Sequence, residues 1–144
     1  MRLFRLGLAG LLLLAPALAV AQSSTKRGEY TVHYSALPTT LLTPEVARNS
    51  GITRSASRGL LNIAVLKDGE IMPEAVTASV EAAAINPAGQ RQNLRMREVR
   101  EGSAIYYLGE PRISEGERLD FEVRITPADG EQITLRFATH FHNR

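Results

Sequence analysis

The stretch that decides the fold is Leu119-Asp120-Phe121-Glu122-Val123-Arg124-Ile125, in which apolar and charged residues alternate without interruption. This period of two is typical of a β-strand with one buried face and one solvated face. An Ala128-Asp129-Gly130 turn follows, and Ile133, Leu135 and Phe137 then alternate with polar residues in the same way. Because an Asp-Gly turn between two alternating runs indicates a hairpin, the two runs predict a pair of antiparallel strands.

Upstream of this hairpin, further strands are predicted from alternation or from short apolar runs bounded by turns. They fall at about residues 30–34, 60–66, 76–84, 94–97 and 105–108, and the alanines of 76–84 are also compatible with a helix. The run at 60–66 is apolar on both faces and is expected in the middle of a sheet. About seven strands with regularly spaced turns predict an all-β fold, a two-sheet immunoglobulin-like sandwich. The cysteines and tryptophan of true immunoglobulin domains are absent from the sequence.

The connection Leu37–Arg58 is long for a link between two strands, and it contains the start of a helix. Thr43 is a preferred N-cap residue, and Pro44 suits the first helical position. Glu45 then lies near the positive end of the helix dipole, where a carboxylate is favourable. We therefore predict one short helix over Pro44–Asn49, in the connection between the first strands.

The N-terminal residues have the pattern of a secretory signal peptide. Arg2 and Arg5 precede the apolar run Leu6–Val20, and Ala19-Val20-Ala21 supplies the small residues of a cleavage site. We expect residues 1–21 to be a signal peptide that is removed, leaving no stable membrane anchor. A flexible leader over 22–27 and a single β-sandwich domain over 28–144 would follow. Export without any cysteine favours a periplasmic location.

Composition excludes several classes of function. The sequence has 17 basic and 15 acidic residues, and loss of Arg2 and Arg5 with the signal peptide makes the two numbers equal. Without a basic excess, we expect no nucleic-acid partner. The absence of cysteine removes thiolate catalysis and cysteine-ligated zinc.

Several short blocks resemble a known family of exported proteobacterial proteins. They include Val32–Ser35, Leu42–Ala47, Gly51–Ser55, Arg58–Ile63 and the stretch from Arg97 through Leu108. By these blocks the chain resembles the family called domain of unknown function 4426, over nearly all of the mature sequence. The resemblance implies a small periplasmic β-sandwich, and it implies no activity.

Three histidines are candidate metal ligands, because imidazole is a common ligand for zinc and copper. His140 and His142 share one face of a strand, and His33 lies on the polar face of the first strand. If the first and last strands pair, the three imidazoles converge. The alternative is that His140 and His142 are ordinary surface residues near a chain end, where frayed structure makes poor sites.

Two other groups are candidate binding residues. Arg54, Ser55 and Arg58 can form an anion clamp, since guanidinium forks match phosphate and carboxylate. Alternatively, they bond loop carbonyls or pair with Glu45. Tyr106 and Tyr107 must place one ring on each face of their strand, and the outward ring either anchors a partner or packs under a loop.

A catalytic constellation is missing from the sequence, which has no G-x-S-x-G elbow and no recognisable nucleophile–base arrangement. We therefore expect a non-catalytic periplasmic binding or accessory module without a cofactor. Its partner would be an envelope protein or a small ligand. One alternative is a periplasmic metal-binding protein that uses the surface histidines, and another is a hydrolase of cell-envelope material.

Overall fold

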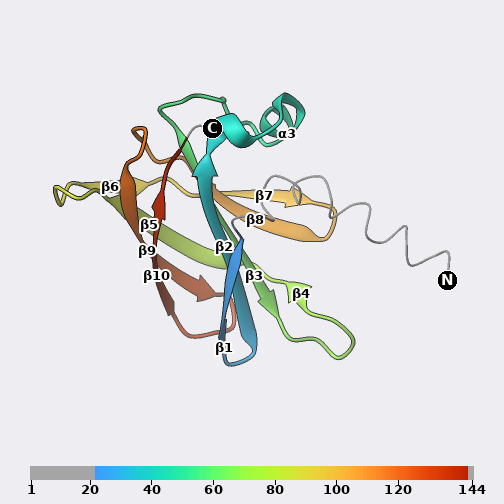
Figure 1. Cartoon of the computed structure of the whole chain (residues 1–144). Coiled ribbons are helices and arrows are strands. Elements are labelled where there is room, and N and C mark those ends of the chain that lie inside the picture. The colour runs from blue at the N-terminus through green and yellow to red at the C-terminus, as the bar shows by residue number, and fades with distance from the viewer. Residues whose placement is uncertain (1–21, 143–144) are drawn as a thin grey trace.

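Two antiparallel sheets pack face to face in the computed structural model, which describes residues 22–142 (Figure 1). The first sheet has the strand order β1-β2-β3-β8-β7, with β4 beside β3, and the second has the order β10-β9-β5-β6. The strands are β1 (Ser23–Arg27), β2 (Tyr30–Pro38), β3 (Gly59–Lys67), β4 (Glu74–Ala75), β5 (Ala78–Ile85), β6 (Arg91–Leu94), β7 (Arg97–Glu101), β8 (Ala104–Gly109), β9 (Arg118–Pro127) and β10 (Ile133–His140). The predicted all-β sandwich of two sheets is confirmed. The signal peptide predicted over residues 1–21 lies outside the described residues.

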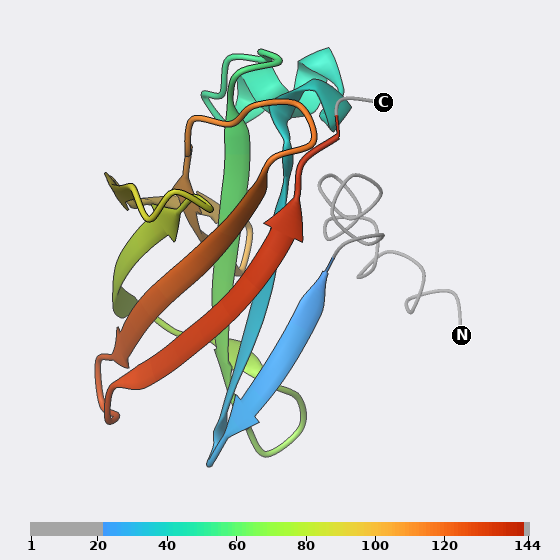
Figure 2. The same cartoon turned by 60° about the vertical axis from the view of Figure 1, so that its left-hand side comes forward.

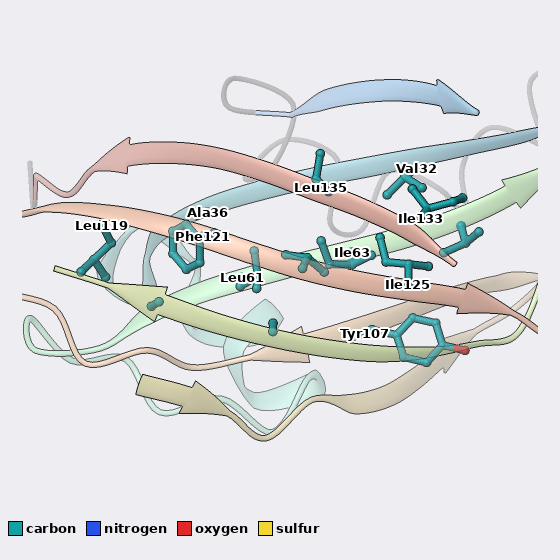
Figure 3. Packing of buried hydrophobic residues seen from close by; sticks show 14 of the residues in the cluster. Val32, Ala36, Leu61, Ile63, Tyr107, Leu119, Phe121, Ile125, Ile133 and Leu135 are labelled. Carbon is teal, nitrogen blue, oxygen red and sulfur yellow. The ribbon is translucent and has the colours of Figure 1, made fainter. Parts of the chain in front are cut away.

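The predicted hairpin forms one side of the second sheet, with β10 at the edge of that sheet. β9 and β10 pair so that Phe121 lies opposite Phe137 and Val123 opposite Leu135. The alternating apolar side chains of β9 are fully buried, and they face the apolar side chains of β2 and β3 from the first sheet (Figure 3). Burial of these aliphatic and aromatic groups, roughly 1.5–3 kcal/mol for each large side chain, drives the two sheets together.

The helix α3 (Pro44–Asn49) lies between β2 and β3, as predicted, and follows the 3₁₀ turn η2 (Thr39–Leu41). The Thr43 hydroxyl accepts a hydrogen bond from the Val46 amide at 3.2 Å, so Thr43 is the N-cap. The helix covers a second, smaller core on the outer face of the first sheet. Its buried members are Leu37, Leu42, Ala47, Ile52, Leu60 and Leu108. The described helices are too short to span a bilayer.

The polar stretch 22–27, expected as a flexible leader, differs from the prediction. Ser23–Arg27 forms strand β1 and pairs with residues 30–34 of β2. Gly28 has a φ of 59°, a left-handed conformation that glycine adopts at no steric cost and that closes this turn. Because nearly all of β1 is exposed, its side chains carry no alternation of apolar and polar residues by which a strand could be predicted.

The single strand expected around Leu94 and Met96 is divided between the two sheets. β6 ends at Leu94 in the second sheet, and β7 begins at Arg97 in the first. The chain crosses the side of the sandwich between them, and Met96 packs partly buried against the main core. Gly109 leaves the space that Met96 fills, since a Cβ at Gly109 would lie 2.5 Å from the Met96 sulfur.

Candidate functional site

A groove runs along the side of the sandwich where the chain crosses between the sheets. It encloses about 470 Å³, and we call it the arginine groove after four of its lining residues. The residues that matter for its chemistry are Arg91, Arg95, Arg97 and Arg112, with the partly exposed Leu94 as its apolar part. Glu110 is the one carboxylate among its described lining residues.

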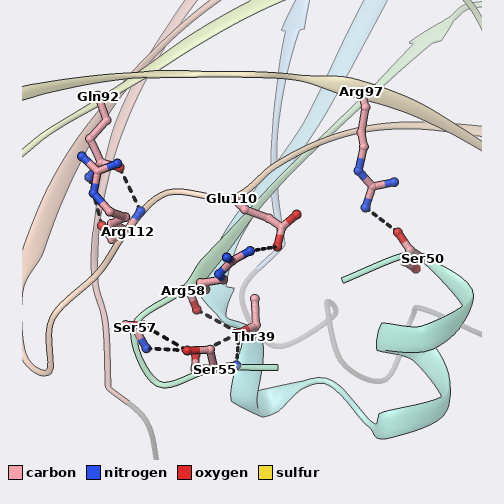
Figure 4. Close-up of polar contacts among 9 residues, drawn as sticks. All are labelled: Thr39, Ser50, Ser55, Ser57, Arg58, Gln92, Arg97, Glu110 and Arg112. Carbon is pink, nitrogen blue, oxygen red and sulfur yellow. Dashed lines mark hydrogen bonds and ion pairs between the residues drawn. The ribbon is translucent and has the colours of Figure 1, made fainter. Parts of the chain in front are cut away.

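The four arginines differ in how their guanidinium groups are engaged. Arg91 pairs with Glu122 at 3.1 Å, and Arg97 donates to the carbonyl oxygen of Ser50 (Figure 4). Within residues 22–142, the guanidinium groups of Arg95 and Arg112 have neither an ion pair nor a hydrogen bond. Two of the four cationic groups are therefore available to an incoming ligand.

The wall that carries Arg112 is held in place by one side chain of β6. Gln92 donates from Nε2 to the Arg112 carbonyl at 3.0 Å and accepts from the Arg112 amide at 2.8 Å (Figure 4). Arg112 also forms an isolated β-bridge with Arg58. These contacts tie the Arg112 segment to β6 and to the residue that precedes β3.

The carboxylate of Glu110 does not neutralise the groove. Its Oε1 lies 3.7 Å from Nη1 of Arg58, so this charge is directed to an arginine outside the groove lining (Figure 4). Planar guanidinium groups form paired hydrogen bonds with carboxylate and phosphate. Because Arg95 and Arg112 are exposed, their attraction for an anion is screened by salt. The groove is suited to binding anionic groups with an affinity that falls as ionic strength rises.

The residues of the loop predicted as an anion clamp form hydrogen bonds and an ion pair within the protein. Arg54 donates to the Thr40 carbonyl at 3.0 Å, and Ser55 donates from its amide to the Thr39 hydroxyl at 2.9 Å. Arg58 is directed toward Glu110. Arg54 thus makes a loop-carbonyl contact, whereas the Ser55 amide bonds a side chain and Arg58 pairs with Glu110 and not with Glu45. The three residues do not gather around a shared cavity among those described.

Tyr106 and Tyr107 lie on opposite faces of β8. Tyr107 is buried in the main core, where its hydroxyl donates to Glu98 and accepts from the Ala78 amide. Tyr106 packs half-buried against the small core beneath α3. Burial raises the pKa of both phenols, and the negative charge of Glu101 raises that of Tyr106 further.

The three histidines are not brought together. The strand that carries His33 is β2, which pairs with β1 and β3, whereas β10 pairs with β9. The predicted pairing of the His33 strand with the last strand is therefore not formed. His33 lies on the outer face of the first sheet, where burial lowers its pKa, and His140 lies on the outer face of the second sheet. The rings of His140 and His142 stack with centroids 6.5 Å apart. Among residues 22–142, no group of three or more His, Cys, Asp or Glu side chains could hold a metal ion.

Arg95 and Arg112 were missed by sequence reasoning. The alternation between Arg91 and Arg100 predicts a solvated strand face, which is true of each short strand taken alone. The groove exists because the chain changes sheets at Leu94–Arg97 and because Arg112 lies across from Gln92. The density of arginine over residues 91–112 is the one signal that points to this region.

The family described as Domain of unknown function (DUF4426) matches residues 24–143. A crystal structure of a DUF4426 family protein from Pseudomonas aeruginosa PAO1 is similar in fold, with a TM-score of 0.73 and 28% sequence identity. That similarity covers 85% of this chain and 96% of the Pseudomonas chain. No curated protein matches the chain.

More distant structures share the fold alone. FetP of uropathogenic Escherichia coli strain F11, expressed in the periplasm, has a TM-score of 0.60 and 9% identity, covering 85% of this chain and 94% of FetP. A copper-bound variant of FetP has a TM-score of 0.60 and 10% identity, covering 83% of this chain and 94% of the variant. At such low identity, the copper bound by that variant says nothing about the residues of this chain.

Proposed function

The chain belongs to the family described as Domain of unknown function (DUF4426), and we propose that it is a non-catalytic, exported binding module that holds anionic groups in the arginine groove. The observation that carries the proposal is the pair of guanidinium groups on Arg95 and Arg112, which face a groove and have no partner within residues 22–142. A carboxylate or phosphate placed there would satisfy both groups.

The chemistry of the lining favours binding over turnover. The described lining supplies guanidinium and amide donors, and its carboxylate, Glu110, is directed toward Arg58. A nucleophile with a base in hydrogen-bond reach, which covalent catalysis needs, is not found among these lining residues. The groove is therefore suited to binding anionic groups, and the partly exposed side chain of Leu94 offers a small apolar contact beside them.

Export is the second part of the proposal. Its support is the signal-peptide pattern in residues 1–21, which would deliver the domain to the periplasm. In that compartment the module would meet carboxylates, phosphates and acidic segments of envelope proteins. These ligands share one chemistry, and the groove selects for the anionic group they have in common.

Binding of defined anions tests the groove. Titration of the protein with inorganic phosphate, citrate and hexaglutamate, followed by amide chemical shifts at low ionic strength, should move the resonances of residues 91–97 and of Glu110 and Arg112. In the variant Arg95→Glu/Arg112→Glu we expect the dissociation constant to rise at least about tenfold, because two attractive charges become repulsive. Added salt should weaken binding to the unaltered protein.

A matched variant separates the groove from simple net charge. Arg48→Glu/Arg54→Glu removes the same charge from the α3 region, where Arg54 already bonds the Thr40 carbonyl. This control should bind the anions almost as well as the unaltered protein. If the control and the groove variant lose binding equally, or if none of the three anions shifts the groove resonances, the proposed function is wrong.

A further inference from the structure

The connection between β3 and β4 ends in two apolar side chains that face solvent. Ile71 is 97% exposed and Met72 is 66% exposed, and they are neighbours in the chain. Leaving large apolar side chains in water forgoes roughly 1.5–3 kcal/mol for each one. Isolated exposed apolar residues are common on protein surfaces, so further observations are needed before this pair indicates an interaction.

The same connection is held in a defined shape. Gly69 lies so close to the Met72 carbonyl that a Cβ at Gly69 would be 2.4 Å from that oxygen. Asp68 accepts from the Lys26 ammonium at 3.0 Å, and its amide donates to the Glu29 carbonyl at 2.8 Å. These contacts fix the base of the connection on the β1–β2 hairpin, so the apolar pair is presented at a fixed end of the molecule.

Acidic residues surround the apolar pair. Glu70 and Glu74 flank Ile71 and Met72, and both carboxylates are exposed without an ion pair or a hydrogen bond in the described part of the chain. We call residues Glu70–Glu74 the acidic tip. The two carboxylates of the acidic tip would be repelled by an anionic membrane surface and attracted by a basic groove. The two apolar side chains lie between these carboxylates.

The arginine groove has the complementary chemistry. It offers the free guanidinium groups of Arg95 and Arg112, and it offers the partly exposed side chain of Leu94. The acidic tip and β6, which forms one side of the groove, lie at opposite ends of the molecule (Figures 1 and 2). One molecule therefore cannot fill its own groove with its own tip.

We propose that the acidic tip of one copy docks in the arginine groove of a second copy, an inference that rests on the groove being an anion-binding site. Glu70 and Glu74 would pair with Arg95 and Arg112, while Ile71 and Met72 would cover the apolar part of the groove. This contact is head-to-tail, so each copy keeps one free tip and one free groove, and the assembly is open-ended. The contact is small, and it is expected to be weak and sensitive to salt.

Mixing two blocked variants tests the contact. Arg95→Glu/Arg112→Glu blocks the groove and keeps the tip, whereas Ile71→Ser/Met72→Ser blocks the tip and keeps the groove. At high concentration and low ionic strength, sedimentation velocity should show growing assemblies for the unaltered protein and monomers for each variant alone. An equal mixture should form complexes of two copies only, because a single intact tip and a single intact groove remain.

The outcomes separate this inference from the proposed function. A mixture that stays monomeric, or an unaltered protein that stays monomeric at every concentration, overturns self-docking. If phosphate, citrate or hexaglutamate still binds in the groove under those conditions, the proposed function survives that failure. The control Arg48→Glu/Arg54→Glu should assemble like the unaltered protein, and its failure to do so would attribute assembly to net charge and overturn the contact.

Discussion

The hydroxyl of Tyr107 donates a hydrogen bond to Oε1 of Glu98 at 3.0 Å, across the β7–β8 hairpin. The same hydroxyl accepts a hydrogen bond from the Ala78 amide at 2.9 Å. Ala78 is the first residue of β5 in the second sheet, whereas Tyr107 belongs to the first sheet. The phenol of Tyr107 therefore joins the two sheets through polar contacts at the margin of the apolar core.

Replacement Tyr107→Phe should lower the free energy of unfolding by about 1–3 kcal/mol, because it leaves the Ala78 amide without its partner. Urea denaturation followed by fluorescence or circular dichroism measures this change. Tyr106→Phe is the matched control, since the Tyr106 hydroxyl has no hydrogen bond within residues 22–142. Equal losses in the two variants would show that the bridge adds no stability.

The pH dependence of stability should also change in Tyr107→Phe. Burial raises the pKa of the Tyr107 phenol above its ordinary value of 10.0, so the folded state holds this proton more tightly than the unfolded state. The resulting stability is fully present below pH 10 and is lost as the pH rises through the raised pKa. Urea midpoints between pH 8 and pH 11 should fall less steeply in Tyr107→Phe than in the unaltered protein. An unchanged slope would contradict this assignment.

The Thr43 hydroxyl at the N-cap should stabilise α3 through a single hydrogen bond. Thr43→Ala removes the acceptor of the Val46 amide and should cost about 1 kcal/mol, whereas Thr43→Ser should retain most of that energy. Hydrogen exchange localises the effect, because the Ala47 amide bonds the Thr43 carbonyl and the Ser50 amide bonds the Val46 carbonyl. Faster exchange of these two amides in Thr43→Ala alone is expected. Equal exchange in both variants would mean that the cap does not hold the helix.

The elements that could be predicted are those whose burial or first turn leaves a recognisable pattern of residues in the local sequence. Leu119–Ile125 alternates because one face of β9 is buried, and Thr43-Pro44-Glu45 begins a helix because each residue satisfies a requirement of the first turn. β1 was expected as a leader because its pairing with β2 uses backbone groups and leaves its side chains in solvent. Backbone pairing of an exposed strand has no side-chain signature.

The candidate site could not be predicted for a different reason. Arg95 and Arg112 are 17 positions apart in the sequence, and they meet only because β6 and β7 lie in different sheets. The histidines were grouped in the sequence by residue type alone, and the fold separates them. His33 and His140 lie on the outer faces of different sheets. Residue type suggests which chemistry is available, and the topology decides which side chains share a surface.

Ser35 and Asn62 form a buried polar pair on the first sheet, and removing the Ser35 hydroxyl should increase the stability of the fold. Ser35 is 2% exposed and lies opposite Asn62 on β3, and among residues 22–142 neither Ser35 Oγ nor Asn62 Oδ1 has a hydrogen-bond partner. Removing an unsatisfied buried hydroxyl should help, so Ser35→Ala is expected to raise the free energy of unfolding by up to about 1 kcal/mol. Ser24→Ala, on the exposed strand β1, should have almost no effect. A loss of stability in Ser35→Ala would show that its hydroxyl is satisfied by a bound water.

Metal titration distinguishes the histidine arrangement in this fold from the converging site predicted from sequence. His140 and His142 lie close enough to stack, while His33 lies on the other sheet. Zn²⁺ added to protein without a purification tag should therefore shift the imidazole resonances of His140 and His142 together and leave His33 unchanged. Two exposed imidazoles near the chain end make a weak site, so the melting temperature should hardly rise. A substantial rise that disappears in His33→Asn would contradict this arrangement, because it would require all three imidazoles to bind one ion.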